Sequence, residues 1–340
     1  MKERTDGRQI NVKASVVIPA YNADQTLINC LNALREQDIA IPYEIIVVDD
    51  CSDDQTASLV TGSDVTLIKH DKRRGAAAAR NNGIKAARGE IICFTDADCA
   101  PKSDWLYEIL IPFSDRSISG CKGVYITRQN EVVARFVQIE YEDKYNLLEK
   151  QAHIDFIDTY SAAYRREVLQ TNNGFDEQFT YLEDQELSFR LAARGYKMVF
   201  HPQAAVYHQH ADSLAAYARK KFTIGYWKAQ VVRRFPNRLI QDSHTPQVMK
   251  VQMLLAALAM AAALAVLITP WSGVILGAVL LLFFMSAVPF IRKAWAKDKL
   301  VALASPFLLF VRAGALGFGY AWGLAKPAQI LEQGNLINNR

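Results

Sequence analysis

The sequence has 340 residues, enough for one large or two ordinary domains, and its net charge of +4 is unremarkable. The 51% hydrophobic content is above the usual soluble level, and the excess is concentrated between Val251 and Ile291, where no charged residue occurs. The first 13 residues are polar and charged, so we expect no secretory signal there. The five cysteines are odd in number and lack a CxxC pair, which argues against a disulfide framework or a zinc site.

Apolar runs of strand length alternate with helical patterns in the first hundred residues. The predicted buried strands are Ala14–Pro19, Tyr43–Val48, Val65–Lys69 and Ile91–Phe94. One helix is expected to start near Asp24 as its N-cap, and another opens within Gly75–Gly83. This alternation predicts an α/β domain around a mostly parallel sheet flanked by helices. The turn after the first strand reads Pro-Ala-Tyr-Asn and lacks GxGxxG, which disfavours a nicotinamide or flavin enzyme.

Four aspartates follow two of these strands directly. Asp49 and Asp50 come after the second strand, and Asp96 and Asp98 come after the fourth. In open α/β sheets the ligand binds outside the carboxyl ends of the strands, so these positions indicate one site. Asp96 and Asp98 are one residue apart and can converge on a single point, and their hard oxygens suit Mg²⁺ or Mn²⁺.

Five segments occur here in the order found in family 2 glycosyltransferases, which the chain resembles over residues 14 to 210. Four of them are Ser15–Asn22, Ile46–Ser52, Gly75–Gly83 and Phe94–Asp98, and the fifth combines Asn173–Phe179 with Glu183–Leu187. The resemblance implies the GT-A fold, a UDP- or GDP-linked sugar donor, a metal-dependent hexosyl or related transfer, and single displacement with inversion. One residue departs from the family pattern, because Glu186 stands where an aspartate is common.

The resemblance also implies roles for the donor-binding residues. Either Asp49 or Asp50 would accept a hydrogen bond from the nucleotide base, with Asp50 preferred, although either carboxylate could instead cap a helix. Pro19 and Tyr21 would line the nucleoside pocket. Arg80 would pair with phosphate or reach the base, its alternative being a solvated helix arginine.

The resemblance further implies the metal ligands and the catalytic base. Asp98 would bind the cation, and Asp96 would bind it too or face the ribose or sugar. His208 follows an apolar run and is a further metal candidate, although a lone histidine is more often structural. Glu183 and Asp184 open a predicted helix closed by Gly195, and Asp184 would be the base with Glu183 beside it. Their alternative is a capping carboxylate.

The last third of the chain has the pattern of a membrane region. Ser213–Gln241 contains seven basic residues and no acid, interleaved with aromatics, and predicts a helix on an anionic membrane surface rather than a nucleic-acid site. Val251–Ile268 and Val274–Ile291 are each long enough to span a bilayer. The segments that flank this pair are rich in basic residues, so we expect both flanks on the cytoplasmic side. Leu300–Ala325 contains Arg312 and is expected to span, the alternative being an interfacial position.

These patterns predict four segments and one function. The segments are a catalytic domain at 1–212, a basic interface segment at 213–248, a transmembrane region at 249–325 and a tail at 326–340. We expect an inverting glycosyltransferase in the inner (cytoplasmic) membrane, with its catalytic domain in the cytoplasm and a polyprenyl-linked glycan or glycolipid as acceptor. The alternatives are a processive polysaccharide synthase subunit, for which so few spans build no channel, and a non-catalytic membrane scaffold. The intact acidic motifs argue against the scaffold.

Overall fold

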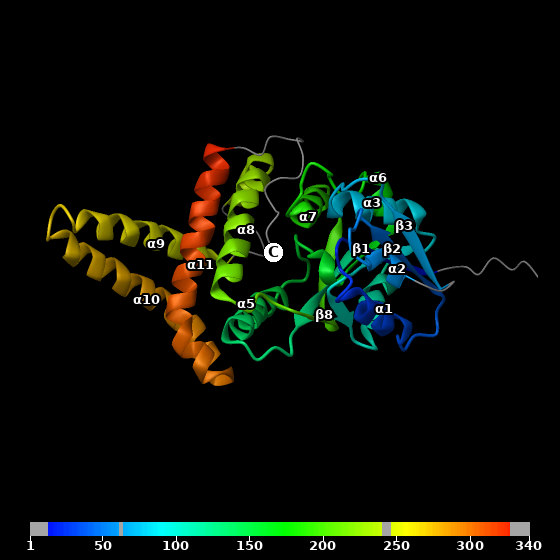
Figure 1. The fold of residues 1–340 in the computed structure, drawn as a ribbon, viewed down its shortest axis with the longest axis horizontal. Helices are drawn as coiled ribbons and strands as arrows, with labels where there is room; N and C mark the ends of the chain where they lie inside the picture. The colour runs from blue at the N-terminus through cyan, green and yellow to red at the C-terminus, as the bar shows by residue number, and fades with distance from the viewer. Residues whose placement is uncertain (1–12, 61–63, 240–245, 327–340) are drawn as a thin grey trace, which may run out of the picture. The chain divides into compact units, whose positions relative to one another are not determined.

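The computed structural model describes residues 13–60, 64–239 and 246–326 (Figure 1). The predicted polar N-terminus before residue 13 and the predicted tail beyond residue 326 lie outside the described residues. The chain forms two compact units, each built from segments distant in sequence. The first comprises Met1–Ile126, Ile157–Glu177 and Arg190–His208, and the second comprises Thr127–Phe156, Gln178–Phe189 and Gln209–Arg340.

The first unit contains one eight-stranded sheet in the order β3-β2-β1-β4-β7-β6-β8-β5. Its strands are β1 (Ala14–Ala20), β2 (Tyr43–Asp49), β3 (Val65–Lys69), β4 (Ile91–Phe94), β5 (Cys99–Pro101), β6 (Ile118–Ile126), β7 (Ala162–Arg165) and β8 (Lys197–His208). The pairs β1–β2, β2–β3, β1–β4 and β6–β8 are parallel, whereas β4–β7, β6–β7 and β5–β8 are antiparallel. The prediction of a mostly parallel sheet is confirmed.

Short helices connect these strands. They are α1 (Leu27–Arg35), α2 (Thr56–Leu59), α3 (Ala76–Ala86), α4 (Trp105–Leu110), α6 (Arg166–Thr171) and the 3₁₀ turns Ile111–Ser114 and Thr159–Ser161. Helix α1 begins at Leu27 with Thr26 as its N-cap, so the predicted start at Asp24 is wrong. The Asp24 amide instead donates to the Asp54 carboxylate, which keeps this residue in the preceding loop.

The order of the first four strands creates a topological switch point. The chain proceeds from β1 outward to β2 and β3, then returns to place β4 on the other side of β1. Connections after β1 and after β4 therefore leave the sheet in opposite directions, and ligands of open α/β sheets bind at such a switch point. The residues just after Ala20 and Phe94 lie at this position.

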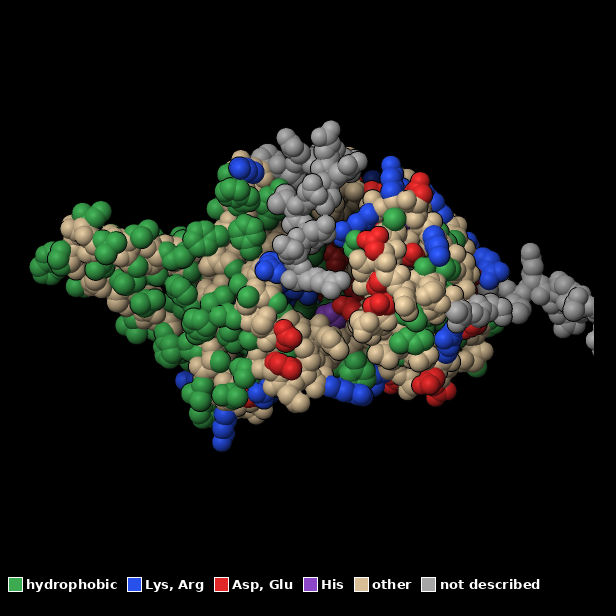
Figure 2. Space-filling model, viewed as in Figure 1, with side chains coloured by type: hydrophobic (Ala, Val, Ile, Leu, Met, Phe, Trp, Pro, Cys, Tyr) green, Lys and Arg blue, Asp and Glu red, His purple; other side chains and the backbone are tan. Residues whose placement is uncertain are grey.

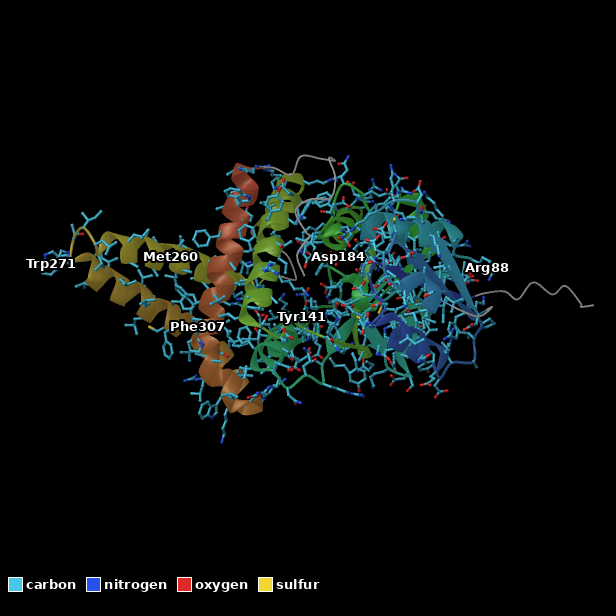
Figure 3. The ribbon with its side chains drawn as sticks, in the orientation of Figure 1. Arg88, Tyr141, Asp184, Met260, Trp271 and Phe307 are labelled. Carbon is cyan, nitrogen blue, oxygen red and sulfur yellow. The ribbon has the colours of Figure 1, made fainter. Side chains whose placement is uncertain are left out.

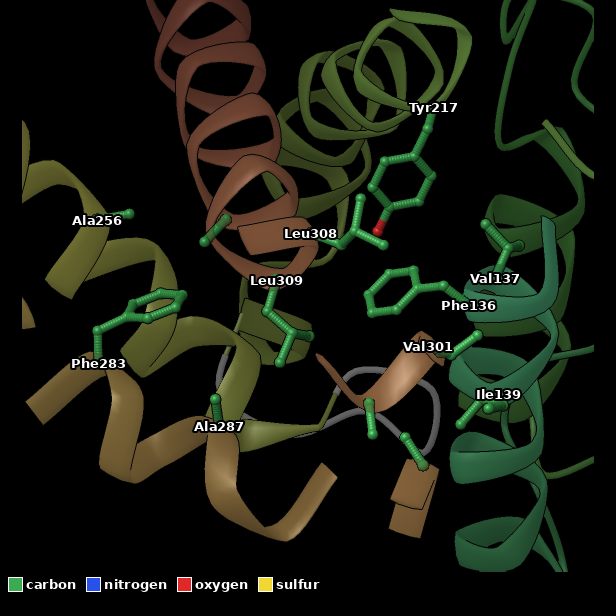
Figure 4. Close-up of a cluster of buried hydrophobic side chains, with 13 residues drawn as sticks. Phe136, Val137, Ile139, Tyr217, Ala256, Phe283, Ala287, Val301, Leu308 and Leu309 are labelled. Carbon is green, nitrogen blue, oxygen red and sulfur yellow. The ribbon is translucent and has the colours of Figure 1, made fainter. Parts of the chain in front are cut away.

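The second unit is all-helical among the described residues. It contains α5 (Val132–Leu148), the start of α7 (Glu183–Ala193), α8 (Leu214–Arg234), the 3₁₀ turn Pro236–Leu239, α9 (Gln247–Ala265), α10 (Ser272–Lys297) and α11 (Lys299–Ala325). A buried apolar cluster joins α5, α8, α9, α10 and α11, with Phe136, Tyr217, Phe283 and Leu309 among its members (Figure 4).

Helices α9, α10 and α11 are long and apolar enough to cross a membrane, judged by length and composition. Hydrophobic side chains cover the outside of α9 and α10 (Figure 2). Leu264, Leu281 and Val274 are among these exposed side chains. A contiguous apolar surface of this size is unfavourable in water and marks a surface that contacts protein or membrane.

Helix α8 holds most of the predicted basic segment, but it does not lie wholly on the surface. It packs along α11, and Tyr217 is only 1% exposed. Two of its cations have acidic partners in the same unit, Lys221 with Glu140 at 3.1 Å and Arg234 with Glu186 at 3.6 Å. The side chains of Arg219, Lys220 and Arg233 are exposed.

Candidate active site

The two aspartates at the end of β2 are both buried and both hold the surrounding loops. Asp50 accepts hydrogen bonds from the amides of Arg74 and Gly75 at 2.8 and 2.7 Å, and His70 Nδ1 lies 2.6 Å from its Oδ1. Asp49 Oδ1 accepts from the Ser52 amide at 3.2 Å. Neither caps the following helix α2, whose N-cap is Gln55. Asp50 therefore fixes the turn that starts α3.

That turn also positions a cation beside the end of β1. The Arg73 guanidinium lies 3.9 Å from the centre of the Tyr21 ring, a cation–π contact. Pro19 lies in β1 and Tyr21 just follows it, so both predicted nucleoside-pocket residues are at the switch point. A flat aromatic ring next to a guanidinium and a carboxylate suits a planar base linked to phosphates.

Arg80 is buried rather than solvated. It is 4% exposed, and its Nη2 donates to Asp96 Oδ1 at 2.8 Å. Its guanidinium also lies 5.7 Å from the centre of the Phe175 ring. The alternative of a solvated helix arginine is therefore wrong, and Arg80 orients the first aspartate of the DxD segment.

The second aspartate meets the candidate histidine because two short strands pair. In the antiparallel β5–β8 ladder, Cys99 lies opposite His208. Asp98 immediately precedes Cys99, and its Oδ1 lies 3.5 Å from His208 Nδ1. Ligand atoms of Asp98, Cys99 and His208 all lie within 4.8 Å of one another. The carboxylate suits a hard cation such as Mn²⁺ or Mg²⁺, and the imidazole is a ligand of borderline divalent cations.

The cysteine in this cluster is not a thiolate. Burial raises the pKa of the Cys99 thiol well above its usual value, and Asp98 and Asp96 raise it further. In the metal-free protein the thiol is therefore protonated at neutral pH, and a protonated thiol is a poor metal ligand. Asp98 and His208 remain as the residues that fit a hard or borderline cation, with Asp96 engaged by Arg80.

An aromatic stack supports the histidine ring. The Tyr125 ring stacks on His208 with ring centres 4.3 Å apart, and on Tyr160 with ring centres 3.2 Å apart. Tyr125 lies in β6, which pairs with β8, so the sheet register sets this contact. The stack restricts rotation of the His208 ring, which preorganises it as a ligand.

The segment Asn173–Phe175 is clamped by α3. Asn81 accepts from the Phe175 amide at 2.9 Å and donates to the Phe175 carbonyl at 2.9 Å. Gly174 has φ +60°, and a Cβ there would lie 2.4 Å from Asn81 Oδ1. These two motifs are therefore one structural unit that holds Phe175 against Arg80.

Glu183 and Asp184 begin α7, as predicted, and lie in the second unit (Figure 3). Glu183 is 8% exposed, and Asp184 Oδ1 accepts from the Gln185 amide at 2.7 Å. Burial raises the pKa of the Tyr141 hydroxyl, and nearby charges including Asp184 add to the rise. The helix N-terminus stabilises a carboxylate at this place.

Backbone strain marks the same segments. The described non-glycine residues with positive φ are Asn22, Cys51, Asn173 and Leu182. Asn22, Cys51 and Asn173 lie within the motif segments, and Leu182, at φ +61°, directly precedes Glu183. Such conformations cost about 1–3 kcal/mol each and cluster at functional sites. Asparagine adopts this conformation readily, as at Asn22 and Asn173, whereas a leucine side chain disfavours it.

Sequence reasoning missed Cys99, Tyr125, Arg73 and Asn81 as neighbours of the site. Cys99 directly follows Asp98, so the sequence does indicate that it lies near the site. Nothing in the sequence indicates that it lies opposite His208. Tyr125 is 83 residues from His208, so only strand pairing reveals the contact.

Comparison with known proteins finds similar sequences. The sequence model described as Glycosyl transferase family 2 matches residues 15–172. The amylovoran biosynthesis glycosyltransferase AmsB of Erwinia amylovora is 30% identical over 215 residues, which cover 58% of this chain and 70% of that protein. The pre-mycofactocin glycosyltransferase of Mycobacterium tuberculosis is 26% identical over 235 residues, 66% of this chain and 48% of the relative. The chain thus spans about half the length of that curated relative.

A solved structure shares the fold. The mannosyltransferase PcManGT of Pyrobaculum calidifontis, in complex with GDP-Man and Mn²⁺, superimposes with a TM-score of 0.60 at 22% identity. The match covers 92% of this chain and 87% of that one. The GT-A-like fold followed by apolar helices is thereby confirmed.

Proposed function

Because the chain belongs to the family 2 glycosyltransferases, we propose that it transfers a sugar from a nucleotide-diphosphate donor to a lipid-linked acceptor at the cytoplasmic face of the inner membrane. The observation that carries the proposal is the meeting of Asp98 with His208 at 3.5 Å beside the Arg80–Asp96 pair. The groups that we assign to metal and to sugar thus follow the switch point of the sheet, where ligands of such folds bind, which supports the proposal.

Different residues bind the base, the diphosphate and the sugar of the donor. Tyr21 and Pro19 bind the nucleoside, and Asp49 or Asp50 accepts from the base N–H. Asp50 also holds the turn with Arg73 and Arg74, whose charges suit a diphosphate. Asp96, oriented by Arg80, accepts from the ribose or sugar hydroxyls.

Asp98 and His208 would hold a divalent cation, Mg²⁺ or Mn²⁺. When bound, the cation neutralises the charge that develops on the diphosphate as it leaves. Asp184 is the base: its carboxylate takes the proton of the acceptor hydroxyl, whose oxygen bonds to the anomeric carbon while the bond to the diphosphate breaks. Attack opposite the leaving group inverts the anomeric centre. Glu183 is the acidic residue beside Asp184 at the start of α7.

The apolar helices favour an acceptor that is itself associated with the membrane. An enzyme anchored by α9 and α10 meets substrates that share the membrane, so an amphiphilic acceptor such as a polyprenyl-linked glycan fits. The mannosyltransferase of Pyrobaculum calidifontis was solved with GDP-Man and Mn²⁺, which makes GDP-sugars with Mn²⁺ the first combination to test. At 22% identity, that likeness supports the fold alone.

The test uses the full-length protein in lipid nanodiscs. UDP-, GDP- and dTDP-sugars are screened for thermal stabilisation with Mn²⁺ or Mg²⁺, and the stabilising donor is then assayed for transfer to polyprenyl-linked acceptors. We expect one nucleotide class to stabilise the protein, and a product with one or a few added sugars. A long polymer would instead support the processive synthase, and no stabilisation by any donor would overturn the proposal.

The catalytic step has its own variant. Asp184→Asn is expected to lower turnover by about 10²–10⁴-fold while leaving donor stabilisation intact, because general-base catalysis contributes that much. Asp212→Asn changes an exposed aspartate of the same unit and serves as the matched control. Full turnover in Asp184→Asn would remove this residue as the base.

A further inference from the structure

Helix α11 runs across the α9–α10 hairpin instead of beside it (Figure 1). The hairpin has its closed end at Trp271, which is 82% exposed (Figure 3). Transmembrane helices tilt by about 20° on average and rarely beyond about 40°. If the hairpin crosses the bilayer, α11 therefore lies close to the membrane plane. Hydropathy makes all three helices candidate spans, so it overstates the number of spans.

Helix α8 keeps α11 out of the hydrocarbon. The two backbones touch along several turns: a Cβ at Gly319 would lie 2.0 Å from the Phe222 carbonyl oxygen, and one at Gly225 would lie 2.3 Å from that of Leu316. Gln230 Nε2 also donates to the Gly323 carbonyl at 2.8 Å. Helix α8 carries six lysines and arginines. Each charge costs about 2.5–3.5 kcal/mol at the bilayer centre, so α8 stays outside together with the helix packed along it.

The middle of α11 is held in a group of buried charges. Arg312 is 6% exposed and donates to Glu140 of α5 at 2.8 Å, and Glu140 also pairs with Lys221 of α8. If α11 spanned the bilayer, these three charges would lie near its midplane. Arg312 also donates to Gln252, which lies near the start of α9. The midpoint of α11 is thus level with the base of the hairpin.

The hairpin itself matches a bilayer. Its helices have 19 and 26 residues, about 28 and 39 Å at 1.5 Å per residue, against a hydrocarbon core about 30 Å thick. Its outward side chains are apolar, with Leu264 68% and Leu281 60% exposed. The exposed cations Arg219, Lys220 and Arg233 of α8 suit anionic headgroups at its base.

We propose that the α9–α10 hairpin is the element that crosses the bilayer, and that α11 lies with α8 in the interface. This rests on the membrane location included in the proposed function. It has a discrete consequence: after two spans, Lys326 at the end of α11 is on the same side as the sheet-containing unit, whereas after three spans it is on the opposite side. This replaces the sequence expectation that Leu300–Ala325 spans.

Cysteine accessibility separates the two topologies without using activity, so it is independent of donor and acceptor. The background is Cys51→Ser, because the other four native cysteines are buried. Single reporters are Glu167→Cys in the first unit, Trp271→Cys at the hairpin tip and Lys326→Cys. Each protein is reconstituted in phosphatidylcholine–phosphatidylglycerol vesicles and treated with a membrane-impermeant maleimide before and after detergent.

We expect the reacted fraction before detergent to be the same for Lys326→Cys as for Glu167→Cys, and complementary for Trp271→Cys. Protection of Lys326→Cys in the same vesicles where Glu167→Cys reacts would overturn the proposal. Equal reaction of Trp271→Cys and Glu167→Cys would also overturn it, since the hairpin would then not cross. A protein that fails to float with the vesicles contradicts both this inference and the membrane location, whereas a donor screen that fails contradicts only the proposed chemistry.

Discussion

His208 Nδ1 lies 3.5 Å from Asp98 Oδ1, although 110 positions separate the two residues in the sequence. The antiparallel pairing of β5 with β8 makes this contact, and the Tyr125 ring holds the imidazole in place. The pair is the best-supported cation site among the described residues.

Removing either member of this pair should weaken metal binding. We expect Asp98→Asn and His208→Ala each to lower Mn²⁺ affinity by at least about tenfold, since even outer groups of metal sites contribute 10–100-fold. Titration of Mn²⁺ by electron paramagnetic resonance measures this without turnover. Asp115→Asn, an exposed carboxylate in the same unit, is the control. Unchanged affinity in both variants would place the cation elsewhere.

Arg80 should act on donor binding through Asp96. Arg80→Gln removes the partner that holds Asp96 Oδ1, so we expect about tenfold weaker binding of the nucleotide sugar, equal to about 1.4 kcal/mol. Lys85→Gln removes an exposed charge from the same helix and should bind the donor as the unsubstituted protein does. Calorimetric titration with the donor makes the comparison, and equal affinities for the two variants would contradict the assignment.

Gly174 should be intolerant of a side chain for two separable reasons. In Gly174→Ala the new Cβ clashes with Asn81 Oδ1 and the residue keeps φ +60°, so we expect a loss of about 2–3 kcal/mol. Gly195 has φ +83° with open space around its Cβ position, so Gly195→Ala should cost only about 1 kcal/mol. Thermal unfolding of both variants isolates the clash. Equal losses would mean that the Asn81 clamp does not constrain Gly174.

Glu140 should stabilise the second unit in a pH-dependent way. Burial opposes its charge, but Lys221 and Arg312 outweigh this and lower the pKa of Glu140 from 4.5 to about 2. Because the folded pKa is depressed, the contribution is complete above about pH 4.5 and declines as pH falls toward 2. Glu140→Gln leaves two buried cations without an anion and should cost about 3–5 kcal/mol at neutral pH.

The measurement compares thermal unfolding of Glu140→Gln with that of the unsubstituted protein at pH 7 and at pH 3, where the difference should shrink. Glu142→Gln breaks the more exposed pair with Lys297 and should cost no more than about 1 kcal/mol at either pH. A pH-independent deficit in Glu140→Gln would show that lost packing, not charge, is responsible.

The outward face of the hairpin should reject charge. Leu281 is 60% exposed near the middle of α10, so Leu281→Lys should reduce the fraction of protein that resists carbonate extraction, at a cost of about 3 kcal/mol. Leu281→Ala shortens the same side chain without adding charge and should stay in the membrane fraction. Retention of Leu281→Lys equal to that of Leu281→Ala would argue that this face is covered by protein, such as a second copy of the chain.

Local residue patterns are enough to predict the α/β class, strand β4 ending at Phe94, strand β2 to within one residue of its end at Asp49, and the start of α7 at Glu183. These follow from local patterns: apolar runs of strand length, helical spacing and turn residues act over a few neighbouring positions. The apolar helices α9 and α10 were equally predictable, because their length and scarcity of charge are local properties.

Which of these residues act together depends on contacts made in the folded protein. The β5–β8 register joins Asp98 to His208, burial turns Arg80 from a surface cation into the partner of Asp96, and packing against α5 and α8 gives Arg312 its counter-ion. The orientation of α11 is decided in the same way, by the glycines that let it touch α8. Such contacts join positions far apart in the chain, and no local pattern encodes the pairing of one distant segment with another.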